Sequence, residues 1–156
     1  MVKEMRKYRK KKQRIFPYKG YELKSSKELI VAKNLTKQKL KWEYETEKIT
    51  WLPPPTKLKT YTPDFIISGV EGKKIYVEYK EFLDTRSKQV LRYVSKQHPE
   101  IDLRILFGVK CARKKIRKGS NTTYGDWADR YRIRWGEGDS LPQEWLKEIQ
   151  TNAKNN

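Results

Sequence analysis

The chain has 156 residues, 36% apolar and 12% aromatic, which suffices for one domain with its own core but not for two comfortable ones. Lysine and arginine number 37 against 19 acidic residues, so the formal net charge is +18. This surplus favours a polyanionic partner, because neutralised phosphates of duplex DNA release counterions. An anionic membrane is excluded as partner: we find no basic amphipathic helix with a bulky apolar face, and no apolar run approaches the roughly 20 residues that span a bilayer.

Cysteine usage and the start of the chain indicate the compartment. Cys111 is the single cysteine, so there is no internal disulfide framework, which fits a reducing cytosol. The basic beginning of the chain is not followed by the apolar segment of a secretory signal. We expect a cytoplasmic protein.

The first segment carries charge of almost one sign. Residues 1–14 hold eight lysines or arginines and one acid, with almost no apolar periodicity, so they cannot bury enough surface to order themselves. We expect a mobile basic arm over residues 1–20 and a folded domain over residues 21–156. The alternative for the arm is a solubilising tail. As an arm that orders on phosphate, it offers four candidate DNA contacts: Arg9, Lys10, Lys11 and Lys12.

The first half of the domain contains a helix, a short strand and a proline-containing bridge. The sequence S-S-K-E at 25–28 forms a capping box, and apolar residues recur at helical spacing to about residue 40. Residues 42–45 alternate like a strand. Three consecutive prolines at 53–55 cannot lie inside a helix or sheet, so we expect a stiff extended connector at about 46–60.

The second half alternates strands and helices. Turn signals at 68–74 separate two strands and predict a hairpin, and a second capping box at 140–143 opens the last helix. In chain order we expect strands at 61–68 and 75–80, a helix at 84–97, a strand at 103–107, a basic loop at 110–118, a helix at 124–131 and a final helix through residue 149.

Two acids and a lysine converge on the predicted hairpin. Glu78 and Lys80 alternate onto the same face of their strand, and Asp64 lies on the partner strand, only about 5 Å away. Carboxylate oxygens suit Mg²⁺, which needs one or two of them together with a phosphate oxygen. A lysine beside them can orient a water or stabilise the charge that develops on phosphorus.

Each of these residues also has a simpler explanation. Glu78 and Lys80 can form a solvated pair on a strand, and an aspartate after a proline can serve a turn. Glu28 can be only the third helical residue of its capping box, where a carboxylate also suits the helix dipole.

The pattern Pro63-Asp64 followed by Glu78-Tyr79-Lys80 resembles the PD-(D/E)xK nuclease signature. A longer likeness, from about Tyr21 to Glu148, is similar to the phage endonuclease I family of Holliday-junction resolvases. It is carried by Y-T-P-D-F at 61–65, V-E-Y-K at 77–80, Q-H-P-E-I-D-L-R-I at 97–105, Y-G-D at 124–126 and P-Q-E-W-L-K-E at 142–148.

This resemblance implies an α/β fold with a PD-(D/E)xK nuclease-like mixed sheet flanked by helices, in a domain-swapped homodimer whose connector crosses between protomers. It implies that Asp64, Glu78 and Lys80 come from one chain and a helical acid, matched by Glu28, from the other. It further implies one or two Mg²⁺ or Mn²⁺ ions per site, held by Asp64, Glu78 and Glu28, and symmetric nicking of two strands in four-way DNA junctions.

Charge and symmetry add two expectations. Five cations of the basic loop are candidate DNA contacts: Arg113, Lys114, Lys115, Arg117 and Lys118. A two-fold junction favours an isologous dimer, to which we expect Val31, Ala32 and Leu35 to contribute apolar surface. Two other functions stay open: a non-catalytic nucleic-acid-binding protein, and a sequence-specific or mismatch endonuclease with the same chemistry.

Overall fold

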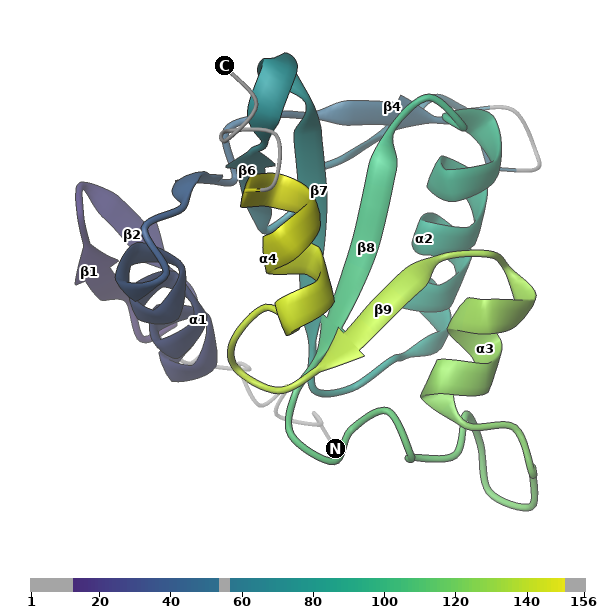
Figure 1. The fold of residues 1–156 in the computed structure, drawn as a ribbon. Helices are drawn as coiled ribbons and strands as arrows, with labels where there is room; N and C mark the ends of the chain where they lie inside the picture. The colour runs from purple at the N-terminus through teal and green to yellow at the C-terminus, as the bar shows by residue number, and fades with distance from the viewer. Residues whose placement is uncertain (1–12, 54–56, 151–156) are drawn as a thin grey trace, which may run out of the picture.

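The computed structural model describes residues 13–53 and 57–150. At its centre lies a five-stranded mixed sheet in the order β3-β6-β7-β8-β9 (Figure 1). Its strands are β3 (Lys41–Tyr44), β6 (Phe65–Ser68), β7 (Lys74–Lys80), β8 (Asp102–Phe107) and β9 (Arg134–Glu137). β6 runs antiparallel to both β3 and β7, whereas β7, β8 and β9 run parallel to one another. The α/β class with a mixed sheet is therefore confirmed.

Four helices connect or cover these strands. They are α1 (Ser26–Lys37), α2 (Thr85–Gln97), α3 (Tyr124–Arg130) and α4 (Gln143–Gln150). The parallel pairs require crossovers, which α2 supplies between β7 and β8 and α3 supplies between β8 and β9. The turn between β6 and β7 contains a short 3₁₀ segment, Val70–Gly72.

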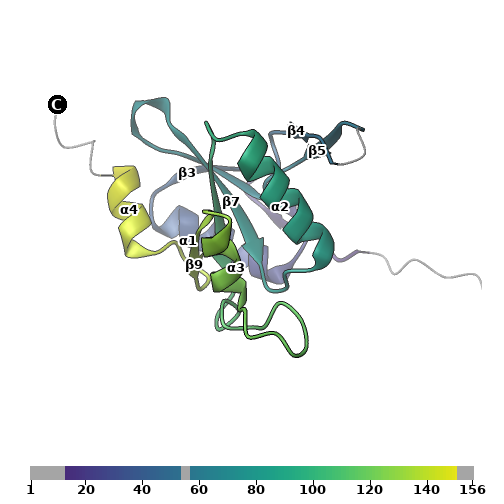
Figure 2. The same ribbon diagram turned by 90° about the vertical axis from the view of Figure 1, so that its right-hand side faces the viewer.

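The helices lie on both faces of the sheet, with α4 and α2 on opposite sides of β7 (Figure 2). Ile75, Val77 and Tyr79 of β7 pack in one core with residues of α1 and α4. Leu103, Ile105 and Phe107 of β8 pack in a second core with residues of α2 and α3. Side-chain alternation along each strand therefore divides the apolar residues between two layers.

The predicted extended connector differs from the structure. β4 (Ile49–Trp51) and β5 (Lys59–Tyr61) pair with each other as an antiparallel hairpin, while residues 54–56 lie outside the described residues. The buried rings of Trp51 and Tyr61 join the core that contains α2, and Trp51 stacks on Tyr93 with centroids 6.0 Å apart. Apolar residues on one face of each flank thus give the hairpin a surface to bury.

The first described segment is also more ordered than expected. β1 (Phe16–Tyr18) and β2 (Tyr21–Leu23) form a hairpin that reaches into residues 1–20, the predicted arm. Its turn places Lys19 and Gly20 at φ 48° and 83°. Aromatic side chains explain the order, because Tyr18 and Tyr21 pack on Trp42. Residues 1–12, including the candidate contacts Arg9, Lys10, Lys11 and Lys12, lie outside the described residues.

The structure also corrects the expected dimer contact on α1 and the strand expected at 61–68. Val31, Ala32 and Leu35 are already buried in the core of the single chain, so these side chains do not supply exposed surface for a dimer contact. The predicted strand at 61–68 is interrupted at 62–64, between β5 and β6. Within the described part of the chain, no helix combines the length and the apolar character needed to cross a lipid bilayer.

Candidate active site

Asp64 directly precedes β6 and lies opposite Glu78 of the neighbouring strand β7. The antiparallel register pairs Phe65 with Val77, so the next step along each strand brings these two acids together. Asp64 is half-buried, and Glu78 is only 6% exposed. The hairpin geometry predicted from the sequence is therefore present, at the carboxyl end of β7.

Both carboxylate oxygens of Glu78 are held. The hydroxyl of Tyr61 donates to Oε2 over 2.7 Å, and Nζ of Lys80 lies 2.8 Å from Oε1. Burial together with the negative charge of Glu78 raises the pKa of Tyr61 well above its usual value, so the hydroxyl keeps its proton and remains a donor. Glu78 is thus fixed in orientation by one neutral and one cationic group.

Asp64 accepts a hydrogen bond at Oδ2 from the backbone N–H of Tyr79, over 2.9 Å. Burial and then the charge of Glu78 raise the pKa of Asp64 well above its ordinary range, although Lys80 opposes this shift. Two acids therefore share one nearby cation. A divalent cation between them would relieve the repulsion that raises the pKa.

Lys80 remains protonated near neutral pH. Burial alone would lower its pKa, but attraction by Glu78 and the hydrogen bond that Lys80 donates to Glu78, followed by attraction by Asp64, outweigh burial and raise the pKa. A lysine in this state donates hydrogen bonds and stabilises negative charge.

Glu28 reaches the same region from α1 without joining the pair. Its Oε2 accepts from the hydroxyl of Tyr44 over 2.6 Å and from the backbone N–H of Lys24 over 3.0 Å, while Ser25 caps the helix by accepting from the N–H of Glu28. The charge of Glu28 contributes to the raised pKa of Asp64. Glu28 thus lies within electrostatic range of the acids in its own chain.

The donor set suits a hard cation held partly by water or phosphate. Among residues 13–53 and 57–150, no group of three or more His, Cys, Asp or Glu side chains lies close enough to hold a metal ion. Asp64 and Glu78 supply two carboxylates, the number that Mg²⁺ requires when phosphate and water complete its shell. The paired acids fit Mg²⁺ or Mn²⁺.

The basic loop at 110–118 begins beside the site. The N–H of Gly108 donates to the carbonyl of Lys80 over 2.9 Å, and Nζ of Lys114 donates to the carbonyl of Glu81 over 2.8 Å. All five candidate DNA-contacting cations of the loop are exposed: Arg113, Lys114, Lys115, Arg117 and Lys118. The loop therefore presents positive charge next to the acids.

Sequence reasoning missed two tyrosines at the site, Tyr61 and Tyr44. Tyr61 opens the motif Y-T-P-D-F, three residues before Asp64, which is the signal that could have identified it. Nothing in the sequence links Tyr44 to Glu28, because the contact forms only when β3 packs beside α1.

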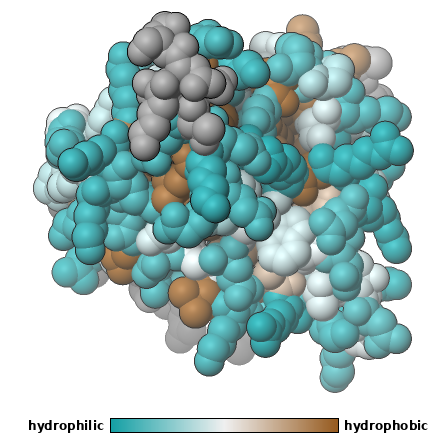
Figure 3. All heavy atoms as spheres, viewed as in Figure 1, coloured by the Kyte–Doolittle hydropathy of each residue, from teal (hydrophilic) through white to brown (hydrophobic). Residues whose placement is uncertain are grey.

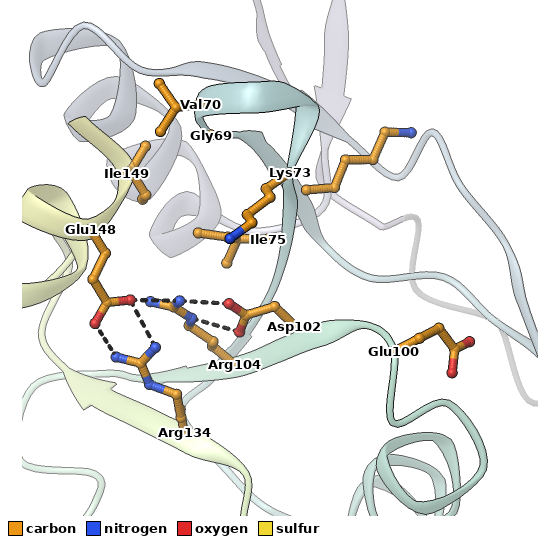
Figure 4. A pocket seen from close by; sticks show the side chains of 11 residues that line it. Gly69, Val70, Lys73, Ile75, Glu100, Asp102, Arg104, Arg134, Glu148 and Ile149 are labelled. Atoms are coloured by element: carbon orange, nitrogen blue, oxygen red, sulfur yellow. Dashed lines mark hydrogen bonds and ion pairs between the residues drawn. The ribbon is translucent and has the colours of Figure 1, made fainter. Parts of the chain in front are cut away.

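The cavity in Figure 4 lies elsewhere. It measures about 620 Å³ and is lined by Ile75 and Asp102, at the starts of β7 and β8, whereas Glu78 and Lys80 lie toward the end of β7. Arg104 within it is paired with Asp102 and Glu148. These side chains neutralise one another and fasten α4 to the sheet, so we do not place the active site there.

Comparison with known proteins identifies the family of the chain. The model of the family described as Phage endonuclease I matches residues 5–156. The protein named Endonuclease I of Escherichia phage T7 is 35% identical over 118 residues, covering 76% of this chain and 74% of that protein. Endodeoxyribonuclease 1 of Enterobacteria phage T3 is 31% identical over 129 residues, covering 83% and 80%. The chain belongs to the phage endonuclease I family.

Proposed function

We propose that this chain is a metal-dependent DNA endonuclease of the PD-(D/E)xK type that resolves four-way junctions by nicking two strands symmetrically. The observation that carries the proposal is the meeting of Asp64, Glu78 and Lys80 beside a basic loop. Relatives named Endonuclease I and Endodeoxyribonuclease 1 support the cleavage of DNA. The charge of +18 supports a polyanionic substrate.

The chemistry follows from the state of each side chain. Asp64 and Glu78 would hold Mg²⁺ or Mn²⁺, one or two ions per site. We propose Glu28 as a further ligand, although within the described residues of the single chain it does not form a group of three with these two acids. Such an ion lowers the pKa of a bound water and offsets charge that develops on phosphorus. Protonated Lys80 donates to a phosphate oxygen and stabilises the same charge. The exposed loop cations hold the flanking phosphates.

A dimer fits this substrate. A four-way junction has approximate two-fold symmetry, so an isologous dimer presents one site to each of two strands. We propose a domain-swapped homodimer, in which the segment at about 46–60 would leave the hairpin that it forms in the single chain and cross between protomers. Glu28 then serves the site of its own chain or that of its partner. Sedimentation at the mass of one chain under all conditions would contradict the dimer.

Cleavage assays test the function directly. A four-way junction, a linear duplex and a single strand of matched sequence are each incubated with the protein, with and without Mg²⁺. We expect paired nicks near the crossover of the junction, only with the metal. Binding without any cleavage would support a non-catalytic nucleic-acid-binding protein. Cutting of the linear duplex at a fixed sequence, with no advantage for junctions, would support a sequence-specific endonuclease.

Substitution of the paired acids separates cleavage from binding. We expect Asp64→Ala or Glu78→Ala to lower the cleavage rate by on the order of 10²–10³-fold or more, because each removes a group that acts on the developing charge. Junction affinity measured in chelator should stay within a few-fold, since the loop makes the phosphate contacts. Glu22→Ala, at an exposed position on β2, is the control. Loss of binding with either active-site variant would refute this division of roles.

A further inference from the structure

A groove between α2 and α3 gathers cations that neither the sequence motifs nor the candidate site explain. Two adjoining hollows of about 800 and 480 Å³ share Arg92, Arg130 and Tyr131 in their walls. The remaining cations that line them come from α2 and from the segment after α3: Lys88, Lys96, Arg132 and Arg134. The groove therefore has cations along both sides.

These cations are largely free to meet a ligand. Within residues 13–53 and 57–150, no ion pair involves Lys88, Arg92, Lys96, Arg130 or Arg132. The two acids in the walls are already engaged, Glu100 by His98 and Asp102 by Arg104. Arg92, Lys96, Arg130 and Arg132 are exposed, and Lys88 is half-buried. The net field of the groove is positive.

The spacing of the α2 cations suits a phosphate backbone. Lys88, Arg92 and Lys96 stand four residues apart and so lie along one face of the helix, spanning about 12 Å. Successive cations in this row lie about 6 Å apart, so each can approach a different phosphate of one strand. Arg130 and Arg132 face the same space from the other wall.

Aromatic rings hold the central arginine in place. The guanidinium of Arg92 lies 4.9 Å from the centroid of the Tyr131 ring and 5.8 Å from that of Tyr93. Stacking leaves the edge of a guanidinium available for hydrogen bonds to phosphate. Arg92 is thus pre-oriented in the groove.

One end of the groove lies near the candidate active site. Ile116, in the middle of the basic loop at 110–118, lines the hollow that also contains Thr85 and Lys88 at the start of α2. The cap of α2, Asp84, lies close enough to Lys80 to contribute to its raised pKa. A backbone that leaves the acids along the loop would therefore enter the groove at its Lys88 end.

We propose that the α2–α3 groove binds the phosphate backbone of a duplex arm of the DNA substrate, at a distance from the cleavage point. The inference rests on the proposed function. It assigns the duplex arm of the DNA a binding surface outside the active site. A single strand lacks the fixed phosphate spacing of a duplex and gains less from the groove.

The test compares two sets of three substitutions that remove the same charge. The groove variant is Lys88→Gln, Lys96→Gln and Arg130→Gln; the control is Lys33→Gln, Lys37→Gln and Lys41→Gln, at exposed positions on α1 and β3. Junction affinity is measured in chelator over a range of salt concentrations. We expect the groove variant to flatten the logarithmic salt dependence by roughly 0.9 per lost contact, more than the control does. The difference should disappear when the junction arms are cut to a few base pairs.

The outcomes separate this inference from the proposed function. If the unmodified protein cleaves junctions but the groove and control variants share one salt dependence, the groove is not a DNA surface and the proposed function stands. If the unmodified protein cleaves no DNA, the proposed function fails, whatever the variants bind. If circular dichroism shows that the triple variant does not fold, the single variants Lys96→Gln and Arg130→Gln take its place. The salt dependence of their junction affinity is then compared with that of single substitutions from the control set.

Discussion

At the scale of single residues, the orientation of Glu78 depends on a hydroxyl from another part of the chain. Tyr61 donates to one oxygen and Lys80 approaches the other, so the carboxylate is held before any cation arrives. A hydrogen bond to a charged group contributes about 1.5–3 kcal/mol. Tyr61 therefore positions Glu78, the proposed metal ligand.

Removing this hydroxyl should weaken the cation site and spare DNA binding. For Tyr61→Phe we expect the Mg²⁺ or Mn²⁺ concentration for half-saturation, measured by calorimetry without DNA, to rise on the order of tenfold. Junction affinity in chelator should be unchanged. Tyr76→Phe is the matched control: Tyr76 lies on β7, as Glu78 does, but its hydroxyl donates to Glu47. Equal metal affinity of the two variants would show that Tyr61 has no positioning role.

The sequence predicts the paired acids but not their supports. Alternation along residues 75–80 and the turn at 68–74 bring Asp64 opposite Glu78, and the structure confirms that register. The capping box at 25–28 is only half as expected, because the side chain of Glu28 accepts from the N–H of Lys24 instead of Ser25. Tyr61 and Tyr44 contact the acids through strand packing, which no local pattern encodes.

At the scale of elements, α4 is fastened to the sheet by charge. Glu148 accepts from Arg134 and from buried Arg104, which also pairs with Asp102 (Figure 4). The guanidinium of Arg104 also lies over the ring of Trp145. The hydrogen bond from Arg134, and then that from Arg104, hold the pKa of Glu148 at about 2 despite some opposing burial. The clamp therefore persists into acid.

Acid should loosen the clamp in a defined range. The pKa of Glu148 is lower in the folded chain, so its contribution is present above the ordinary value of 4.5 and is lost as the pH falls through about 2. Its side chain is 42% exposed, so solvent limits the contribution to about 1 kcal/mol. Glu148→Gln should melt roughly 2–4 °C lower at neutral pH. The melting temperatures of the variant and of the unmodified protein should converge as the pH falls toward 2. A constant difference in melting temperature down to pH 2 would show that the charge of Glu148 does not stabilise the fold.

Element prediction succeeds where the pattern is strong and fails where pairing decides. The four helices and β6, β7 and β8 follow from capping and alternation. β9 was not expected, because R-W-G-E has no regular alternation and forms a strand by pairing with β8. Its Gly136 leaves room for Pro142, which a Cβ would meet at 2.4 Å. The extended connector predicted at 46–60 was wrong because the prediction relied on the three prolines and not on the short strands β4 and β5 on either side of them.

At the scale of the whole molecule, one charge distribution has opposite effects on two kinds of association. Most of the face seen in Figure 3 is hydrophilic, and apolar side chains show there only in separate small patches. Two chains of +18 carry 18 + 18 = +36 together. Like charge opposes the contact of two chains, whereas it favours contact with phosphate.

Added salt should therefore strengthen one association and weaken the other. Between about 0.05 and 0.2 M salt the Debye length shortens, so repulsion between protomers falls while the release of counterions from DNA becomes less favourable. We expect sedimentation without DNA to show more dimer at the higher salt, and junction affinity to fall on the order of 10³-fold. If both associations weaken together, ion pairs between protomers would have to outweigh their repulsion.

The β4–β5 hairpin connects the candidate active site to residues at the far end of α2. Tyr61 ends β5, and the hairpin is anchored where the amide of Gln97 exchanges hydrogen bonds with Leu52 and the ring of His98 meets the carbonyl of Thr50. A change of length in this segment would shift Tyr61 relative to Glu78. We therefore expect residues 46–60 to tolerate insertions less well than a connection between two strands ordinarily does, because a change in their length would also alter the orientation of Glu78.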